Sequence, residues 1–399
     1  MISERRRQLA LVMLAAAVAQ SFGRFTWALL LPAVEDELLS SYGAAGTLGT
    51  TNVAAYLAGT ALVGLISARF LPTTLVRIGL ALSSTGLLVL SLANGFGVLF
   101  VGQVLTGLGG ALIWIPSPGL AATVMPPEKR GVAMGMVSAG IGTGIFVTSQ
   151  AAALLRWIAG DDSWRLLWAA EAAVGLAALL AVHRWLVDDA EAEGPSDVRF
   201  DAVRRVPGWV GLTIAYGAFG LGYSIFINYF VAALEEDAGF SASHASFSYS
   251  VLGVAVIAGG LVLGRLSDRR GRRVTLVGAF TVMAAVTLAP VLGVEPFVTL
   301  AALCFGLVFA GIPAVIAAAV RDDLDPRSFG AAFGALTLAF GFGQVLGPQL
   351  GGSIADATGS FDLAFVVSAA AALLGAIGAA LMPRRPAPAG ADQPAGSNR

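Results

Sequence analysis

Apolar runs long enough to cross a lipid bilayer recur along almost all of this 399-residue chain. A membrane-spanning helix needs about 20 predominantly apolar residues. Only 12% of the residues are charged, about half the share that soluble domains use to cover their surface. We therefore predict an all-α integral membrane protein with twelve transmembrane helices. The apolar runs cover residues 8–32, 44–67, 74–93, 96–122, 131–156, 164–187, 208–233, 244–266, 274–292, 296–319, 329–353 and 361–382.

Basic side chains gather on one side of the predicted membrane. Of the 24 Lys and Arg residues, all but Arg24, Arg156 and Arg165 fall in the N-terminus, the even-numbered loops or the C-terminal tail, and the opposite loops are acidic. Short loops rich in Lys and Arg remain in the cytoplasm. We therefore expect a multi-pass protein of the cell inner (plasma) membrane with both termini in the cytoplasm.

The composition also argues against several function classes. The formal net charge is −1, without the basic excess that nucleic-acid binding requires. Twelve spans leave no room for a soluble catalytic domain, and the chain has no phosphate-binding glycine loop for ATP hydrolysis. We expect no enzyme activity, no cofactor, no metal site and no nucleic-acid partner, so an ion or solute gradient must supply the energy for any transport.

A shift of 199 residues aligns the two halves of the chain. It pairs four of the five glycines between positions 131 and 144 with later glycines, namely Gly131 with Gly330, Gly135 with Gly334, Gly142 with Gly341, and Gly144 with Gly343. We predict two pseudo-symmetric six-helix bundles, residues 1–187 and 208–383, joined by a charged cytoplasmic linker at 188–207. Residues 384–399 are expected to form a disordered cytoplasmic tail.

Several motifs carry a resemblance to a known family. The stretch Gly264-Arg-Leu-Ser-Asp-Arg-Arg-Gly-Arg-Arg273 is similar to the cytoplasmic loop motif of the major facilitator superfamily of secondary transporters, with Asp268 as its acid. The corresponding first-half stretch has Ala68 at the position of that acid. In the fourth helix, Gln103 stands where the similar family motif has an arginine. The run Phe22-Gly-Arg-Phe25 resembles the start of the bacterial YbfB/YjiJ-type subgroup.

The resemblance implies a major facilitator fold and alternating access, with the substrate between helices 1, 4, 7 and 10 at the interface of the two repeats. Small residues let helices in lipid approach each other closely. We expect the glycines of helices 5 and 11 to let these helices slide against the opposite half, with static packing as the alternative for each one; they are Gly135, Gly140, Gly144, Gly334, Gly343 and Gly347.

Arg24 is the residue that most constrains the function. It lies eight residues before Pro32, about 12 Å deep at 1.5 Å per residue. A lone arginine near the bilayer centre costs about 2.5 to more than 10 kcal/mol, so Arg24 requires a partner. One interpretation is a buried ion pair with Glu171 in helix 6. The other is that Arg24 faces a central cavity and binds an anionic substrate, with Glu171 as the coupling residue that carries a proton.

The remaining candidate residues follow from position and chemistry. We assign substrate binding to polar or aromatic residues of helices 1, 4 and 7, namely Arg24, Gln20, Trp114, Tyr216, Tyr223 and Asn228. We assign a cytoplasmic gate to the loop motif and the loop that it would contact in the outward-facing state, namely Asp268, Arg269, Arg272 and Arg130. The alternative for the basic loop is a topology anchor in which Asp268 is solvated.

These observations predict a monomeric secondary transporter, a symporter or antiporter, that moves a small solute across the bilayer by alternating access. Because of Arg24, we expect the solute to be an organic anion, and Glu171 makes a proton the candidate coupling ion. One alternative is a proton-coupled exporter of drugs or metabolites with a mostly apolar cavity. Another is a membrane sensor that transports nothing.

Overall fold

The computed structural model describes the chain except residues 1, 68, 126–129, 188–202, 325 and 385–399. Within the described part, twelve helical segments are long and apolar enough to cross a membrane. The first bundle contains α1 (Ile2–Ala16), η1 (Ala17–Phe25), α2 (Thr26–Leu38), α3 (Tyr42–Ile66), α4 (Pro72–Ser91), α5 (Phe96–Trp114), α6 (Ser117–Val124), α7 (Arg130–Ala159), the short 3₁₀ turn η3 (Asp161–Ser163) and α8 (Trp164–Trp185). The second contains α10 (Trp209–Glu236), α11 (Ala242–Arg270), α12 (Arg272–Val286), α13 (Ala289–Leu292), α14 (Phe297–Arg321), α15 (Pro326–Thr358) and α16 (Asp362–Ala380).

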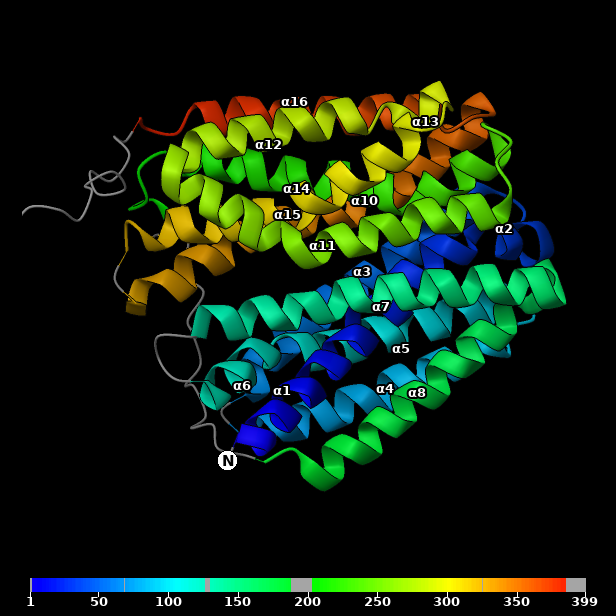
Figure 1. Ribbon diagram of the computed structural model, residues 1–399, viewed down its shortest axis with the longest axis horizontal. Coiled ribbons are helices and arrows are strands. Elements are labelled where there is room, and N and C mark those ends of the chain that lie inside the picture. Colours follow the sequence, from blue (N-terminus) through cyan, green and yellow to red (C-terminus); the bar gives the residue numbers. More distant parts are fainter. Residues whose placement is uncertain (1, 68, 126–129, 188–202, 325, 385–399) are drawn as a thin grey trace, which may run out of the picture.

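The two bundles lie side by side with their helices roughly parallel to one long direction (Figure 1). The start of α1 and the last turn of α16 lie at the same end of the molecule, which we call the terminal end; the other we call the far end (Figure 1). The prediction of twelve spans in two six-helix bundles is confirmed. Most of the predicted linker and all but the first residue of the predicted tail lie outside the described residues.

The first span is longer than the sequence predicted, because Pro32 lies inside α2 and the helix continues to Leu38. In the middle of this span, η1 is a π-helix, in which the backbone N–H of Thr26 bonds to the carbonyl of Ser21. The helix end at Leu38 places Arg24 fourteen residues from that end, about 21 Å along the axis. Arg24 is therefore deeper in the bundle than the predicted 12 Å.

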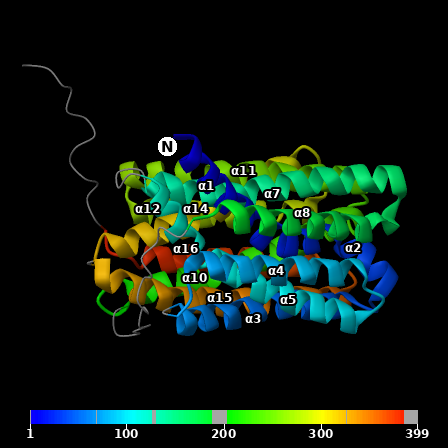
Figure 2. The same ribbon diagram turned by 90° about the horizontal axis from the view of Figure 1, so that it is seen from below.

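Two related helix pairs, α3 with α15 and α7 with α11, form most of the interface between the bundles (Figure 2), and α2 also contacts α10. A methyl group at Gly142 on α7 would lie 2.6 Å from the carbonyl oxygen of Gly253 on α11. At Gly341 on α15 it would lie 2.8 Å from a methyl carbon of Leu57 on α3. Gly142 and Gly341 are partners in the 199-residue repeat, so corresponding glycines let both helix pairs approach closely.

Four of the glycines that we expected at this interface pack inside their own bundle instead. Each lies against a helix of the same half: Gly140 against Met13, Gly144 against Ser21, Gly343 against Gly217, and Gly347 against Ser224. That expectation was wrong because the glycines of one motif occupy different faces of the helix. Only the face that carries Gly142 or Gly341 is turned toward the other bundle.

Polar bonds between the bundles hold the far end together. Arg156, near the end of α7, makes two hydrogen bonds of 2.7 and 2.9 Å to the carboxylate of Glu235 on α10. Both side chains are about nine-tenths buried, with 8% and 11% exposed. Nearer the middle, the hydroxyl of Thr50 on α3 donates to the carbonyl of Val345 on α15 at 2.8 Å.

Candidate functional site

A narrow cavity lies between the two bundles near the middle of the helices. Helices of both halves line it: η1, α2, α3 and α5 from the first bundle, and α10 and α15 from the second. Its polar lining consists of Arg24, Asn52, Gln103, Tyr223, Asn228 and Gln344, together with Ser224. Of the four helices expected to surround the substrate, helices 1, 4 and 7 line this cavity. In the described lining, helices 2 and 11 (α3 and α15) take part and helix 10 (α14) does not.

The guanidinium of Arg24 is held by neutral groups from both bundles. Its Nε lies 3.4 Å from Oδ1 of Asn52 on α3, and its central carbon lies 4.8 Å from the ring centre of Tyr56. From the second bundle, the hydroxyl of Tyr223 lies within hydrogen-bonding reach. Among the described residues, no acidic side chain forms an ion pair with Arg24. The guanidinium therefore lies at the cavity with no negatively charged side chain paired to it in the described part of the chain.

Glu171 on α8 is buried in the first bundle, away from this guanidinium. Its Oε1 accepts hydrogen bonds from the hydroxyls of Thr26 at 2.6 Å and Thr148 at 3.0 Å. Its Oε2 is buried and has no hydrogen-bond partner among the described residues. The predicted alternative of an Arg24–Glu171 ion pair is not formed, although Thr26 and Arg24 are only two residues apart. The first span directs Arg24 to the cavity and Thr26 into the first bundle, toward Glu171.

Three other predicted binding residues lie at or beside the cavity. Tyr223 and Asn228 on α10 line it, and the amide of Asn228 donates to the carbonyl of Ser224 at 2.7 Å. Gln20, one helical turn before Arg24, is buried within hydrogen-bonding reach of the Tyr56 hydroxyl. Gln20 therefore contacts the ring that lies under the guanidinium and supports the arginine indirectly.

Trp114 and Tyr216 are not part of the cavity lining. Trp114 is the last residue of α5 and packs, half-buried, against the hydrophobic core. Tyr216 is buried and stacks on Phe340 with ring centres 4.7 Å apart. Both lie toward the terminal end, and their role in substrate binding stays a prediction.

Three cavity residues were missed as binding candidates, namely Asn52, Gln103 and Gln344. The amide of Asn52 donates to the carbonyl of Gln103 at 3.3 Å and to the hydroxyl of Thr106 at 3.0 Å. Gln344 bonds to the hydroxyl of Tyr223. The signal was present in the sequence, since each is an amide inside an apolar span, where polar side chains are costly unless they bond across helices or meet a ligand.

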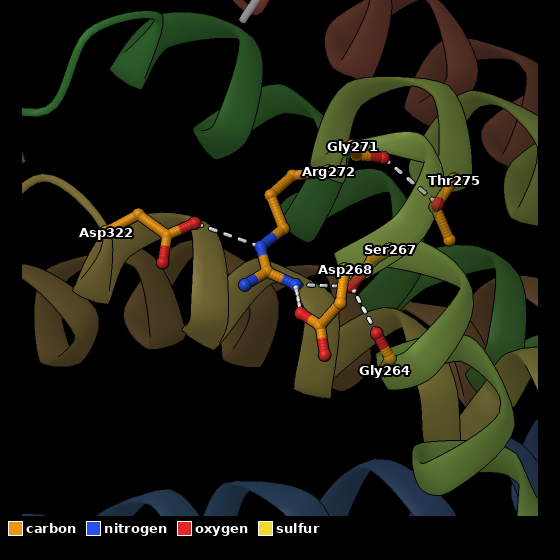
Figure 3. Close-up of polar contacts among 7 residues, drawn as sticks. All are labelled: Gly264, Ser267, Asp268, Gly271, Arg272, Thr275 and Asp322. Carbon is orange, nitrogen blue, oxygen red and sulfur yellow. Dashed lines mark hydrogen bonds and ion pairs between the residues drawn. The ribbon is translucent and has the colours of Figure 1, made fainter. Parts of the chain in front are cut away.

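Two of the four predicted gate residues, Asp268 and Arg272, belong to a network within the second bundle at the terminal end (Figure 3). The guanidinium of Arg272 lies 2.5 Å from Oδ1 of Asp268 and 3.0 Å from Oδ2 of Asp322 at the end of α14. Asp322 was not among the predicted gate residues. Arg269 is exposed and outside this network. The side chain of Arg130 lies outside the described residues, so the predicted contact across the bundles stays a prediction.

A family profile described as the uncharacterised MFS-type transporter YbfB matches residues 16–380. The chain belongs to this family. It is a secondary transporter of the MFS type and a multi-pass membrane protein, so the predicted membership of the major facilitator superfamily and its YbfB-type subgroup is confirmed.

Relatives of this MFS-type chain have been assigned different cargoes. This chain is 25% identical to monocarboxylate transporter 13 of Rattus norvegicus, and the match covers 82% of this chain and 77% of the relative. It is 28% identical to a chloramphenicol efflux pump of Mycobacterium tuberculosis, over 72% of this chain and 70% of the relative. The solved structure of the xylose transporter XylE from E. coli has a TM-score of 0.72 and 16% identity, covering 94% of this chain and 97% of that one. This last similarity shows the fold alone.

Proposed function

We propose that this protein is a carrier of small organic anions and that Arg24 binds the anionic group. The observation that carries the proposal is the position of a guanidinium in the cavity between the two bundles with only neutral partners. An unbalanced cation in a membrane interior is costly, and a bound carboxylate removes that cost through two parallel hydrogen bonds. The similarity to a monocarboxylate transporter supports the same class of cargo.

The location of the site explains how the cargo crosses the membrane. Arg24 belongs to the first bundle and Tyr223 to the second, so a ligand between them contacts both halves. Rocking of one bundle against the other around such a site gives alternating access. A single chain provides the whole site, which supports a monomer. We place the protein in the inner membrane of the cell, with its terminal end in the cytoplasm, as the distribution of basic residues indicates.

Glu171 is the proposed coupling residue, with a proton as the coupling ion. Its carboxyl group is buried and forms no ion pair with any side chain that the structure describes, and a carboxyl group in such a place can take up and release a proton. The two threonine hydroxyls at Oε1 and the unpartnered Oε2 leave one oxygen free to carry the proton. Because Thr26 and Arg24 belong to one span, movement of that span on anion binding reaches the surroundings of Glu171 directly.

The test is uptake of radiolabelled short carboxylates into proteoliposomes with an imposed proton gradient. Arg24→Lys keeps the charge but loses the planar fork that binds both carboxylate oxygens, so its half-saturating concentration should rise by about tenfold or more. Arg24→Gln should abolish uptake. The matched controls are Arg184→Lys and Arg184→Gln, which change an exposed arginine at the terminal end. Wild-type protein that accumulates no carboxylate, or an Arg24→Gln variant with normal uptake, would contradict the proposal.

An exporter of neutral drugs is the second candidate. Aromatic rings pack beside the cavity, with Tyr223 5.1 Å from Phe309 and 5.7 Å from Phe340 between ring centres, and a relative exports chloramphenicol. In this case Arg24 would stabilise the bundles and the cargo would be held by ring contacts. The same vesicles distinguish the two candidates, because export of labelled chloramphenicol should then tolerate Arg24→Lys.

A further inference from the structure

Gln103 on α5 carries a buried amide for which the described part of the chain offers no hydrogen-bond partner. It is fully buried, and it lines the same cavity as Arg24. Neither Nε2 nor Oε1 has a hydrogen-bond partner among the described residues. The other amides of the cavity differ, since Asn52, Asn228 and Gln344 each donate a hydrogen bond.

An amide in this state requires an explanation. Buried polar groups in folded proteins nearly always have a partner, and those that lack one in the unliganded protein often meet a ligand or water. The Gln103 side chain offers a donor and an acceptor at once. A hydroxyl group is a natural partner for such a pair, because it can accept one hydrogen bond and donate another.

Asn52 links the backbone of Gln103 to Arg24. Its Oδ1 lies 3.4 Å from Nε of Arg24, and its Nδ2 lies 3.3 Å from the backbone carbonyl oxygen of Gln103. The helices are close at this level, because a Cβ on Gly23 of η1 would lie 2.9 Å from the Cβ of Thr106 on α5. Asn52 therefore connects Arg24 to the backbone of Gln103, and all three residues line the same cavity.

We infer that Gln103 selects for a hydroxyl group close to the carboxylate, so the cargo class is short hydroxycarboxylates. This inference rests on the proposed role of Arg24 and adds the second point of recognition. Arg24 binds the carboxylate, and Gln103 binds the hydroxyl through both amide atoms. A carboxylate without the hydroxyl would leave the buried amide unsatisfied, and sites of this kind reject such analogues strongly.

The test is binding of matched three-carbon ligands to the purified full-length protein, measured by titration calorimetry. Lactate and propionate differ by the hydroxyl group, and lactamide replaces the carboxylate of lactate by a neutral group. We expect wild-type protein to bind lactate about tenfold or more tightly than propionate. In Gln103→Leu, which keeps the size and removes both polar atoms, the two affinities should become equal within about twofold.

The possible outcomes distinguish a failure of this inference from a failure of the proposed function. Equal binding of lactate and propionate by wild-type protein overturns the hydroxyl selection and leaves the anion site standing. A hydroxyl preference that persists in Gln103→Leu overturns the assignment to Gln103. Lactamide binding as tight as lactate, or no binding of any carboxylate, overturns the anion proposal and with it this inference.

The unliganded stability of the variant is a second readout. If Gln103 has no partner in the protein, Gln103→Leu should unfold at the same temperature as wild type or at a higher one, because no hydrogen bond is lost. A clear decrease would show that the amide holds the bundle together, directly or through water. In that case its role is structural, and the inference fails.

Discussion

The carboxylate of Asp356, near the end of α15, accepts a hydrogen bond from the backbone N–H of Tyr42 and so caps the start of α3 in the opposite bundle. One carboxylate oxygen accepts the N–H of Tyr42 and the other accepts the N–H of Gly43, both at 2.8 Å. The first backbone N–H groups of a helix have no partner within it, and an anion is favoured there by the helix dipole. The cap joins the two bundles at the far end, so opening of that end must break it.

Removal of this cap should favour the conformation that is open at the far end. An N-terminal cap contributes about 0.5–2 kcal/mol, which corresponds to a roughly two- to thirtyfold shift in the balance of closed and open states. The change is Asp356→Ala. The measurement is labelling of a cavity cysteine, Val53→Cys in a Cys304→Ser background, by a membrane-impermeant thiol reagent added at the far side.

Asp362→Ala is the matched control. Asp362 lies at the same end, in the first turn of α16, and is exposed. It should leave the labelling rate unchanged. Equal labelling of the Asp356→Ala protein and its parent would show that the cap does not control opening.

Gly352 on α15 should also be required for closure of the far end. A Cβ at this position would lie 2.0 Å from the carbonyl oxygen of Tyr42, a separation that only a shift of the helices can relieve. We expect Gly352→Ala to lower the free energy of unfolding of the closed state by about 1–3 kcal/mol and to increase far-side labelling. Thermal unfolding in detergent measures the first effect.

The control for this substitution is Gly278→Ala on α12, where an added Cβ meets nothing within 4 Å. Alanine favours a helix over glycine by roughly 0.5–1 kcal/mol, so this variant should be as stable as wild type or more so. If Gly352→Ala and Gly278→Ala unfold at the same temperature, the close approach of Gly352 to α3 does not contribute to stability.

Replacement of Glu171 should uncouple transport without destroying the fold. Glu171→Gln keeps the size and the hydrogen bonds to Thr26 and Thr148, so the change in unfolding free energy should be about 1 kcal/mol or less. Because glutamine cannot carry the proton, accumulation driven by a proton gradient should fall to the level reached without a gradient. Exchange of labelled for unlabelled substrate at equal concentrations should continue.

Thr148→Val is the companion variant for coupling. It removes one hydrogen bond to Oε1 but leaves the carboxyl group, so gradient-driven accumulation should persist. Undiminished accumulation in Glu171→Gln would exclude this carboxyl as the coupling group.

The two acids around Arg272 should differ in their effects on transport. Both ion pairs are partly exposed, with 65% of Asp268 and 41% of Asp322 side-chain surface accessible. Exposed pairs of this kind contribute about 0.2–1 kcal/mol, so neither Asp268→Asn nor Asp322→Asn should lower the melting temperature much. If Asp268 also latches the bundles in the outward-facing state, its substitution should slow transport and shift the conformational balance, while Asp322→Asn should not. Wild-type rate and balance in Asp268→Asn would contradict the latch.

The fold could be predicted from the sequence because the membrane imposes it. Backbone polar groups in lipid must be satisfied within the same segment, so a run of about 20 apolar residues has one available structure. The error at the first span has a local cause, since Pro32 was read as a helix end although α2 continues through it. Prolines are tolerated in transmembrane helices because neighbouring groups compensate for the lost hydrogen bond.

The candidate site was predictable only in part. Arg24 was identified because a charge in an apolar span has few permitted environments. The sequence left two partners open for it, and Asn52 and Gln103 were not assigned to binding. Spacing along a helix gives the face on which a residue lies but not the side to which that face turns. The π-helix η1 changes this relation further, because it rotates the residues that follow it relative to a regular helix.

The number of spans, the duplication and the need of Arg24 for a partner are therefore properties of the sequence, since hydrophobicity and charge act locally. The tertiary structure decided that Arg24 and Glu171 remain apart and that Gln103 lines the same cavity as Arg24. It also decided that Asp356 caps α3 at Gly43, although the two residues are 313 positions apart in the chain. These relationships depend on how two separate bundles dock, and docking is determined by the close packing of small residues such as Gly142 and Gly341 at particular helix faces.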